Sequence, residues 1–151
     1  MAFKTEGFYK MRTAYIMRGI PGSGKSTAAR RLTGPAGALH STDEYFVVDG
    51  VYRFDATRLP EYHARNLAAF KRSLQDGHEV VACDNTNVQL WHMEPYIAAA
   101  TEHGYTVTVI EMPHPDPATA ARRNLHGTPI EVIKEMISLW ESYPGAIIYD
   151  E

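Results

Sequence analysis

The stretch Gly19-Ile20-Pro21-Gly22-Ser23-Gly24-Lys25-Ser26-Thr27 matches the pattern G-x-x-x-x-G-K-[ST] in full. The apolar run Tyr15-Ile16-Met17 precedes it and residues 28–32 continue as a helix-forming segment, which is the strand-then-helix context that the pattern requires. The alternative interpretation is a glycine-rich turn with an incidental lysine. The context favours a phosphate-binding loop.

Elementary chemistry explains why these residue types bind phosphate. Glycines at 19, 22 and 24 allow positive φ and leave no Cβ in the way, so successive backbone N–H groups can surround an anionic oxygen. The helix that opens at 24–26 adds the positive end of its dipole. Lys25 supplies a mobile charge for the β and γ phosphates, and the Ser26 hydroxyl is a hard ligand suited to Mg²⁺. The expected nucleotide contacts are Gly19, Pro21, Gly22, Ser23, Gly24, Lys25, Ser26 and Thr27.

Length, composition and net charge limit the number of domains and the kind of partner that the chain can bind. The chain has 151 residues, of which 44% are hydrophobic, so we expect one domain over residues 11–151, preceded by an N-terminal extension over residues 1–10. The formal net charge of −3 gives no global field that would hold a long polyanion. Any contact with nucleic acid must therefore be local.

Cysteine usage and hydropathy bear on the compartment. Cys83 is the one cysteine, so the chain forms no internal disulfide, and no Cys/His group has zinc-finger spacing. No stretch has the length of a signal-peptide core or of a membrane span. We expect a cytoplasmic protein with no membrane contact and no disulfide partner.

Strand-like and helix-like segments alternate along the chain. We expect strands at 13–18, 38–41, 79–83, 105–111 and 146–149, helices at 24–33, 59–76, 88–103, 117–125 and 130–142, and a hairpin over 46–54 around Asp49-Gly50. Such alternation predicts an α/β fold with three layers, in which helices cover both faces of a five-stranded parallel sheet.

Two aspartates follow predicted strands at the edge where ligands bind in open α/β sheets. We expect Asp43, in Ser41-Thr42-Asp43-Glu44, to be the general base that takes a proton from a substrate hydroxyl. Asp84, in Asp84-Asn85-Thr86-Asn87, either shares that role or orders the water shell of Mg²⁺. The alternatives are a helix N-cap for Asp43 and, for Asp84, a polar turn whose side chains cap their own backbone.

A short helix between Pro117 and Gly127 carries Arg122 and Arg123. Its proline and glycine boundaries are typical of a lid, and an arginine there could act as a finger on the transferring phosphate. Adjacent helical residues point about 100° apart, so one arginine should face the nucleotide and the other should not. A solvated helix face is the alternative. Trp91 and Trp140 are expected to be packing anchors.

These segments together resemble a known family. The residues that carry the resemblance are Arg18 to Thr27, Ser41 to Tyr45, Val81 to Asn87 and Arg123 to Gly127. They are similar to the P-loop kinases of the polynucleotide 5′-hydroxyl kinase type, in the group of AAA-like predicted kinases. The resemblance implies a P-loop NTPase fold with an arginine-bearing lid, and transfer from ATP with Mg²⁺ to a hydroxyl. It implies that Asp43 is the base and that Arg123, which precedes an asparagine, is the lid arginine.

Two positions depart from the family pattern. A basic residue that helps to hold the substrate phosphate is replaced here by Phe46, and a second lid arginine has His126 nearby in its place. The preferred expectation is an ATP- and Mg²⁺-dependent kinase acting on a polynucleotide 5′-hydroxyl. One alternative is a kinase of a nucleoside, sugar or antibiotic, which Phe46 and the acidic balance favour. The other is a nucleotide-dependent interaction module without an acceptor.

Overall fold

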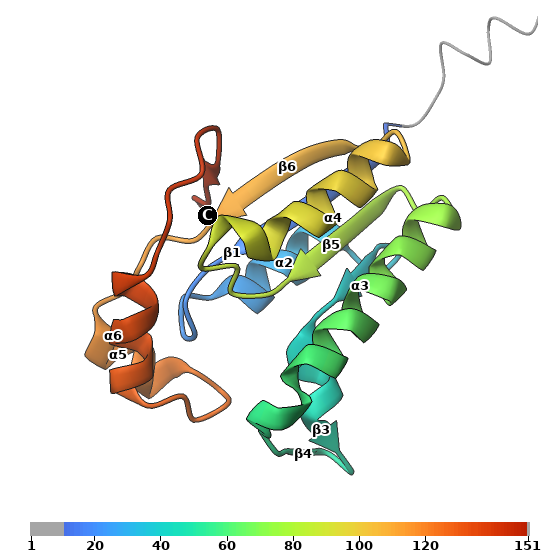
Figure 1. Ribbon diagram of the computed structural model, residues 1–151. Coiled ribbons are helices and arrows are strands. Elements are labelled where there is room, and N and C mark those ends of the chain that lie inside the picture. The colour runs from blue at the N-terminus through green and yellow to red at the C-terminus, as the bar shows by residue number, and fades with distance from the viewer. Residues whose placement is uncertain (1–10, 151) are drawn as a thin grey trace, which may run out of the picture.

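A sheet of five parallel strands forms the centre of the molecule (Figure 1). The computed structural model describes residues 11–150, so the predicted extension over 1–10 lies outside the described residues. The strands are β1 (Thr13–Arg18), β2 (Ala38–His40), β5 (Val80–Asp84), β6 (Thr106–Glu111) and β7 (Ile147–Ile148), in the spatial order β2-β5-β1-β6-β7. The prediction of a five-stranded parallel α/β sheet is confirmed.

Helices cover both faces of this sheet. Figure 1 shows α3 (Leu59–Gln75) and α4 (Leu90–Glu102) in front of it and α2 (Lys25–Thr33) behind it. The short helices α5 (Pro117–Arg123) and α6 (Ile130–Ser138) form a separate lobe beside the carboxyl edge of the strands. The predicted lid corresponds to α5 and the loop that follows it, and we use the name lid for the whole lobe from α5 to α6.

The central strand β1 divides the core in two. Ala14 and Ile16 belong to the apolar cluster that α3 and α4 share with the sheet, whereas Met17 packs with Ala28 and Ala29 of α2. Successive side chains of a strand point to opposite faces, so a strand covered on both sides must be apolar throughout. This explains the continuous apolar run before the phosphate-binding loop.

The strand register decides which residues meet at the carboxyl edge. β1 pairs with β5 on one side, where Met17 lies opposite Asp84, and with β6 on the other, where Arg18 lies opposite Glu111. The loop that follows β1 therefore begins in the middle of the sheet, directly beside the end of β5. The pairing places Asp84 next to the loop although 59 residues separate Asp84 from Lys25.

A second, small sheet projects below α3 in Figure 1. The 3₁₀ turn η1 (Thr42–Phe46) leads into β3 (Val47–Val48) and β4 (Val51–Tyr52), which pair antiparallel, and η2 (Ala56–Arg58) leads on to α3. Asp49 and Gly50 have φ values of 52° and 78°, as a two-residue hairpin turn requires. The hairpin therefore lies where Asp-Gly predicted it.

Some sequence-based expectations were wrong in detail. The last helix ends at Ser138 rather than near 142. Trp91 is 64% exposed and is not a packing anchor. Trp140 does pack, beneath the guanidinium of Arg18.

Candidate active site

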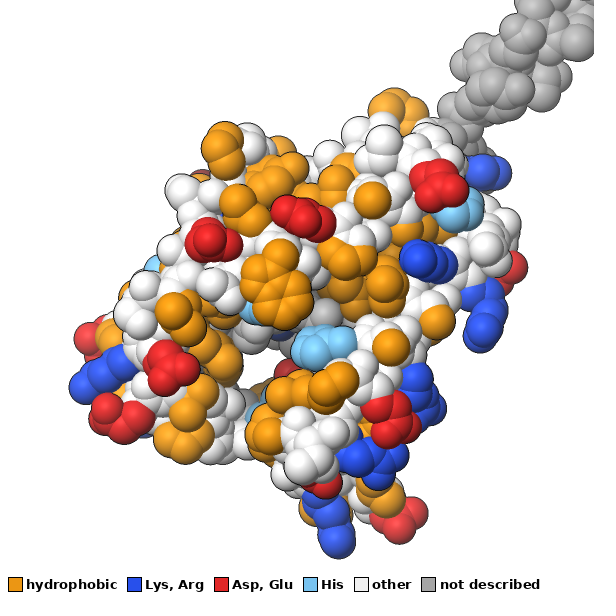
Figure 2. All heavy atoms as spheres, in the orientation of Figure 1, with side chains coloured by type: hydrophobic (Ala, Val, Ile, Leu, Met, Phe, Trp, Pro, Cys, Tyr) orange, Lys and Arg blue, Asp and Glu red, His pale blue; other side chains and the backbone are white. Residues whose placement is uncertain are grey.

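A cleft of about 1060 Å³ lies at the carboxyl edge of the sheet. The segments that line it include the phosphate-binding loop, the start of η1, the hairpin with the start of α3, and the lid, together with residues that follow β5, β6 and β7. In Figure 2 a hollow separates the lid lobe from the lobe of α3 and the hairpin. Ligand cavities commonly span roughly 300–1,000 Å³, so this cleft has room for a nucleotide and a second substrate.

The phosphate-binding loop has the backbone geometry that its glycines allow. Gly22 and Gly24 have φ values of 83° and 87°, and a Cβ at Gly22 would lie 2.3 Å from the carbonyl oxygen of Ala120 in the lid. Gly19 does not adopt positive φ, contrary to expectation. It is needed for close approach instead, because a Cβ there would lie 2.5 Å from Ser23 Oγ.

Lys25 and Ser26, the first residues of α2, both contact Asp84. Lys25 Nζ donates to Asp84 Oδ1 at 2.6 Å, and Ser26 Oγ donates to Oδ2 at 2.9 Å. The Asp84 side chain is only 4% exposed and that of Lys25 is 11% exposed. A buried carboxylate is stable only when paired, so these contacts hold all three groups at the floor of the cleft.

The same residues fit a bound Mg²⁺. Ser26 Oγ and Asp84 Oδ2 are hard oxygen donors that lie side by side, and Mg²⁺ in nucleotide sites takes one or two such protein ligands together with phosphate oxygens and water. Ser23 Oγ, in the loop, is buried and has no hydrogen-bond partner among residues 11–150, which leaves it free for an anion. No group of three or more His, Cys, Asp or Glu residues suited to a metal occurs in that part of the chain.

The four residues of Asp84-Asn85-Thr86-Asn87 connect neighbouring loops. Asn85 Oδ1 accepts from the Thr42 N–H, the Thr86 carbonyl accepts from the Gly19 N–H, and Asn87 Nδ2 donates to the Met17 carbonyl. The alternative of a turn that caps its own backbone is therefore not what forms. The segment fixes the phosphate-binding loop and the Asp43 turn relative to each other.

Arg18 fastens the base of the lid to the sheet. Its side chain is fully buried and donates to the carbonyls of Asn87, Val88 and Glu141 at 2.7 to 2.9 Å, and to Glu111 Oε1 at 3.0 Å. Its guanidinium carbon lies 4.2 Å from the centre of the Trp140 ring. Because Trp140 and Glu141 follow α6, this network anchors the chain where the lid ends.

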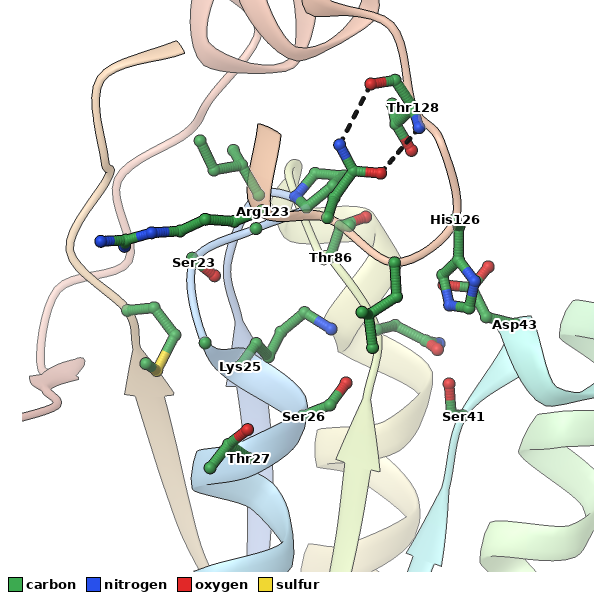
Figure 3. A pocket seen from close by; sticks show the side chains of 18 of the residues that line it. Ser23, Lys25, Ser26, Thr27, Ser41, Asp43, Thr86, Arg123, His126 and Thr128 are labelled. Atoms are coloured by element: carbon green, nitrogen blue, oxygen red, sulfur yellow. Dashed lines mark hydrogen bonds and ion pairs between the residues drawn. The ribbon is translucent and has the colours of Figure 1, made fainter. Parts of the chain in front are cut away.

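Asp43 lies on the opposite side of the cleft from the P-loop floor. Ser41, not Asp43, is the N-cap residue of η1, so the capping alternative does not describe this aspartate. Its side chain is 45% exposed, with Oδ1 3.4 Å from the Tyr52 hydroxyl and Oδ2 3.9 Å from His126 Nε2. Figure 3 shows Asp43 and His126 facing each other across the mouth of the cleft.

Three side chains surround Asp43, from the hairpin, α3 and the lid. Burial, with a contribution from the Asp43 carboxylate, raises the pKa of Tyr52 to about 12, so the phenol stays protonated and donates to Asp43. His63 Nδ1 lies 3.1 Å from Thr42 Oγ1, and burial lowers the pKa of His63 although Asp43 opposes this. Sequence reasoning missed Tyr52 and His63, because nothing in the spacing of 43, 52 and 63 reports their proximity.

Phe46 has a different role from the one its sequence position suggested. It is 2% exposed and packs on Phe54 and Tyr62, with ring centroids 5.1 and 4.7 Å away. It is not among the residues that line the cleft. The departure at this position therefore builds the hairpin core and creates no apolar acceptor pocket.

The two lid arginines lie differently relative to the cleft. Arg123 lines the cleft, whereas Arg122 is not among the lining residues of the described chain and donates to Thr119 Oγ1. In Figure 3 the Arg123 side chain runs along the lid, away from the Lys25 ammonium. In this conformation Arg123 is placed over the cleft but is not aimed at the P-loop floor.

Comparisons with known proteins agree with this geometry. Residues 15–126 match the AAA domain family AAA_33. Human NEDD4-binding protein 2 is 37% identical over 148 residues, which cover 89% of this chain. The chain spans between 7% and 12% of the length of the curated relatives that it matches over 88–89% of itself.

Solved structures share the fold at low identity. A chain of the Pnkp1/Rnl/Hen1 RNA repair complex superposes with a TM-score of 0.68 at 18% identity, covering 89% of this chain and 46% of that one. A gluconokinase from Sinorhizobium meliloti 1021 superposes with a TM-score of 0.58 at 15% identity, covering 93% and 83%. Within residues 11–150, no helix has the length and apolarity needed to cross a bilayer. Together with the P-loop and its paired aspartate, these matches show that the chain belongs to the AAA_33 family of AAA domains.

Proposed function

We propose that this protein is an ATP- and Mg²⁺-dependent kinase that transfers the γ-phosphoryl group to a hydroxyl, with a polynucleotide 5′-hydroxyl as the preferred acceptor. The observation that carries the proposal is that one cleft holds both a phosphate-binding floor and an accessible carboxylate opposite it. Phosphoryl transfer requires held phosphates, neutralised charge and an oriented nucleophile. Each requirement has a candidate residue here.

The donor is held by the loop and by Lys25. On nucleotide binding, the backbone N–H groups of the loop and the Lys25 ammonium contact the β and γ phosphates, while Ser26 and Asp84 hold Mg²⁺ directly or through water. When bound, the metal neutralises phosphate charge. Lys25 then exchanges its contact with Asp84 for phosphate oxygens.

Asp43 is the proposed general base. The acceptor hydroxyl takes the place of the Tyr52 phenol beside Oδ1, and its proton moves to the Asp43 carboxylate as the oxygen bonds to phosphorus. The bond between the γ-phosphorus and the bridging oxygen breaks, and ADP leaves. Arg123 covers the bound nucleotide from the lid, and a finger role would require it to turn toward the floor.

Basic side chains on α3 support a polynucleotide acceptor. Residues 59–75 contain three Lys or Arg residues and one Asp or Glu residue, in a chain whose net charge is −3, whereas the turn and hairpin before α3 are acidic at Asp43, Glu44 and Asp49. In Figure 2 Lys and Arg side chains lie over α3 and the hairpin, with Asp and Glu side chains among them. The Arg65 guanidinium lies 4.5 Å from the centre of the Tyr45 ring, and the Arg58 guanidinium lies 5.0 Å from the centre of the Tyr62 ring. These cation–π contacts hold both guanidinium groups in place. This lobe also carries Asp43.

The test offers labelled ATP and Mg²⁺ with 5′-hydroxyl DNA, 5′-hydroxyl RNA, and a panel of nucleosides and sugars. We expect label on the 5′ end of the oligonucleotides. Label on a small acceptor alone would favour the small-molecule alternative, with which the fold shared with gluconokinase is compatible. Label in free phosphate alone would contradict both kinase assignments and favour a nucleotide-dependent interaction module.

A further inference from the structure

The lid is firmly held at its base. Ile20 of the phosphate-binding loop forms an apolar cluster with Ala120 of α5 and Ile133 of α6. The Glu141 carbonyl, beyond α6, accepts from Arg18 at 2.7 Å. Motion of the lid must therefore occur at its tip, which is the loop between α5 and α6.

The tip is a preformed loop. Asn124 Nδ2 donates to the carbonyls of Ala120, Ala121 and Thr128, and Asn124 Oδ1 accepts from the Thr128 N–H at 2.7 Å. Figure 3 shows the two bonds between Asn124 and Thr128 that close the loop. This closure fixes the backbone on both sides of Leu125 and His126 and presents both side chains outward. The asparagine that follows Arg123 is thus a loop-forming residue.

His126 is the tip residue that reaches the other wall of the cleft. Its ring stacks on Tyr52 of the hairpin, with centroids 4.0 Å apart and planes 24° apart. Its Nε2 also lies 3.9 Å from Asp43 Oδ2. A loop from the lid and a strand from the hairpin therefore meet directly above the proposed base, although Tyr52 and His126 are 74 positions apart in the sequence.

We propose that the stacked Tyr52–His126 pair is a latch that positions the lid over the acceptor side of the site. This inference rests on the proposed function. When the rings are stacked, the tip closes the mouth of the cleft beside Asp43 and limits the access of water to the γ-phosphate. When they separate, the acceptor end enters. His126 is a positioning residue in this scheme, because it acts through the lid and not on the reacting atoms.

The first test measures the lid directly. Leu125→Cys and Val51→Cys place spin labels on the tip and the hairpin, at positions that are 89% and 49% exposed, while the native Cys83 is buried and will not be labelled. We expect a narrow distance distribution in the parent and a broader, longer one in His126→Ala. Aromatic stacking of ordinary strength corresponds to a shift of roughly 2- to 10-fold in the ratio of closed to open lid. An unchanged distribution would overturn the proposal.

The second test separates ring stacking from polar contact with Asp43. His126→Phe keeps a ring that can stack, whereas His126→Gln keeps polar groups without a ring. We expect His126→Phe to keep the label distance of the parent and a low ratio of ATP hydrolysis to acceptor phosphorylation. We expect His126→Gln to raise that ratio roughly 2- to 10-fold, as His126→Ala does. Rescue by Gln and not by Phe would overturn the stacking latch. Arg122→Ala, on α5 and outside the lining of the cleft, is the control and should leave the ratio unchanged.

The two proposals fail in distinguishable ways. If the parent protein phosphorylates no acceptor, the proposed function fails, yet the label distances in His126→Ala and His126→Phe still decide the latch. If the parent transfers phosphate and the distances and ratios do not respond to any His126 variant, the latch fails while the kinase assignment stands.

Discussion

The donor half and the acceptor half of the cleft are built differently. On the donor side Asp84 is 4% exposed, Lys25 is 11% exposed and each is hydrogen-bonded, while Arg18 behind them is fully buried. On the acceptor side the Asp43 and His126 side chains are 45% and 36% exposed and contact each other at 3.9 Å. Buried, paired charges are expensive to rearrange, whereas exposed groups held by ring contacts adapt easily. The proposed donor site is thus preorganised, and under the proposed function selection among acceptors belongs to the adaptable half.

Among the variants of the donor half, Lys25→Ala should cause the largest loss of turnover. Removing a preorganised charge at the transferring phosphate should lower turnover at least ~10³-fold, below detection in a labelled-ATP assay. The variant leaves Asp84 buried without its cation, so thermal unfolding must be measured in parallel to show that the chain is folded. Turnover within tenfold of the parent in a folded variant would contradict the role of Lys25.

Asp43→Asn tests the acceptor half in the same assay. Loss of a general base lowers transfer by ~10²–10⁴-fold, while ATP affinity should stay at the parent value because Asp43 is remote from the Lys25 pair. Asp49→Asn is the matched control, since Asn-Gly forms the same hairpin turn as Asp-Gly. Transfer rates near those of the parent for Asp43→Asn would show that this aspartate only shapes the turn.

The variants Arg123→Ala and Arg122→Ala test whether the lid acts on the donor half or on the acceptor half of the cleft. Because Arg123 lines the cleft but points away from Lys25, we expect its loss to raise the KM for ATP about tenfold or more, the magnitude of one charged hydrogen bond. Arg122→Ala should change KM and kcat less than twofold. A fall in kcat at unchanged KM for Arg123→Ala would instead indicate that Arg123 turns inward as an arginine finger. Equal losses of activity for Arg122→Ala and Arg123→Ala would contradict the arrangement in which only Arg123 faces the cleft.

A smaller effect is expected on the basic face of α3. Arg65→Gln should raise the KM for a 5′-hydroxyl oligonucleotide several-fold and lessen its log–log salt dependence by about 0.7, as expected for one lost phosphate contact to a single strand. Lys71→Gln is the control, because six residues along the helix place it well away from the Arg65 face. Equal effects of the two substitutions would show that net charge, rather than a positioned arginine, is responsible.

The smallest expected effect is a loss of folding stability at acidic pH, caused by His40 at the end of β2. Burial, assisted by His78, lowers the pKa of His40, whose Nε2 lies 2.8 Å from Ser73 Oγ. The folded state therefore binds fewer protons than the unfolded chain, so stability is full above the unfolded pKa of about 6.5 and falls as the pH drops below it. Thermal unfolding from pH 8 to 5 should show this decline, and His40→Gln should reduce its slope. A parent whose stability rises on acidification would refute the assignment.

Much of the fold could be predicted because local patterns and sheet topology agree. The apolar run before Gly19 required a strand covered on both faces, and Asp116 with Pro117 marked the start of α5, where Asp116 caps the N–H groups of Ala118 and Thr119. The carboxyl ends of parallel strands share one edge, so Asp43 and Asp84 could be expected near the loop. Helix ends were less predictable, since α6 stops at Ser138 while its apolar stripe continues to Trp140.

The acceptor side could not be predicted in the same way. Tyr52, His63 and His126 come from a hairpin, a helix and a lid loop, and no spacing relates them. Trp91 was expected to be buried by residue type, yet it is 64% exposed, whereas Leu90 and Met93 of the same turn of α4 pack on the core. Phe46 replaces a basic residue of the family pattern, which favoured a small acceptor, yet in the structure it is a core residue of the hairpin.

The sequence by itself determined the phosphate-binding loop, because Gly19 to Thr27 carries its chemistry within nine consecutive residues and needs only a strand before it and a helix after it. Only the tertiary structure decided what faces that phosphate. The β1–β5 pairing brings Asp84 onto Lys25 and Ser26, and the fold of the lid and hairpin brings His126 and Tyr52 onto Asp43. Contacts between distant segments depend on packing and register, which local sequence patterns do not encode.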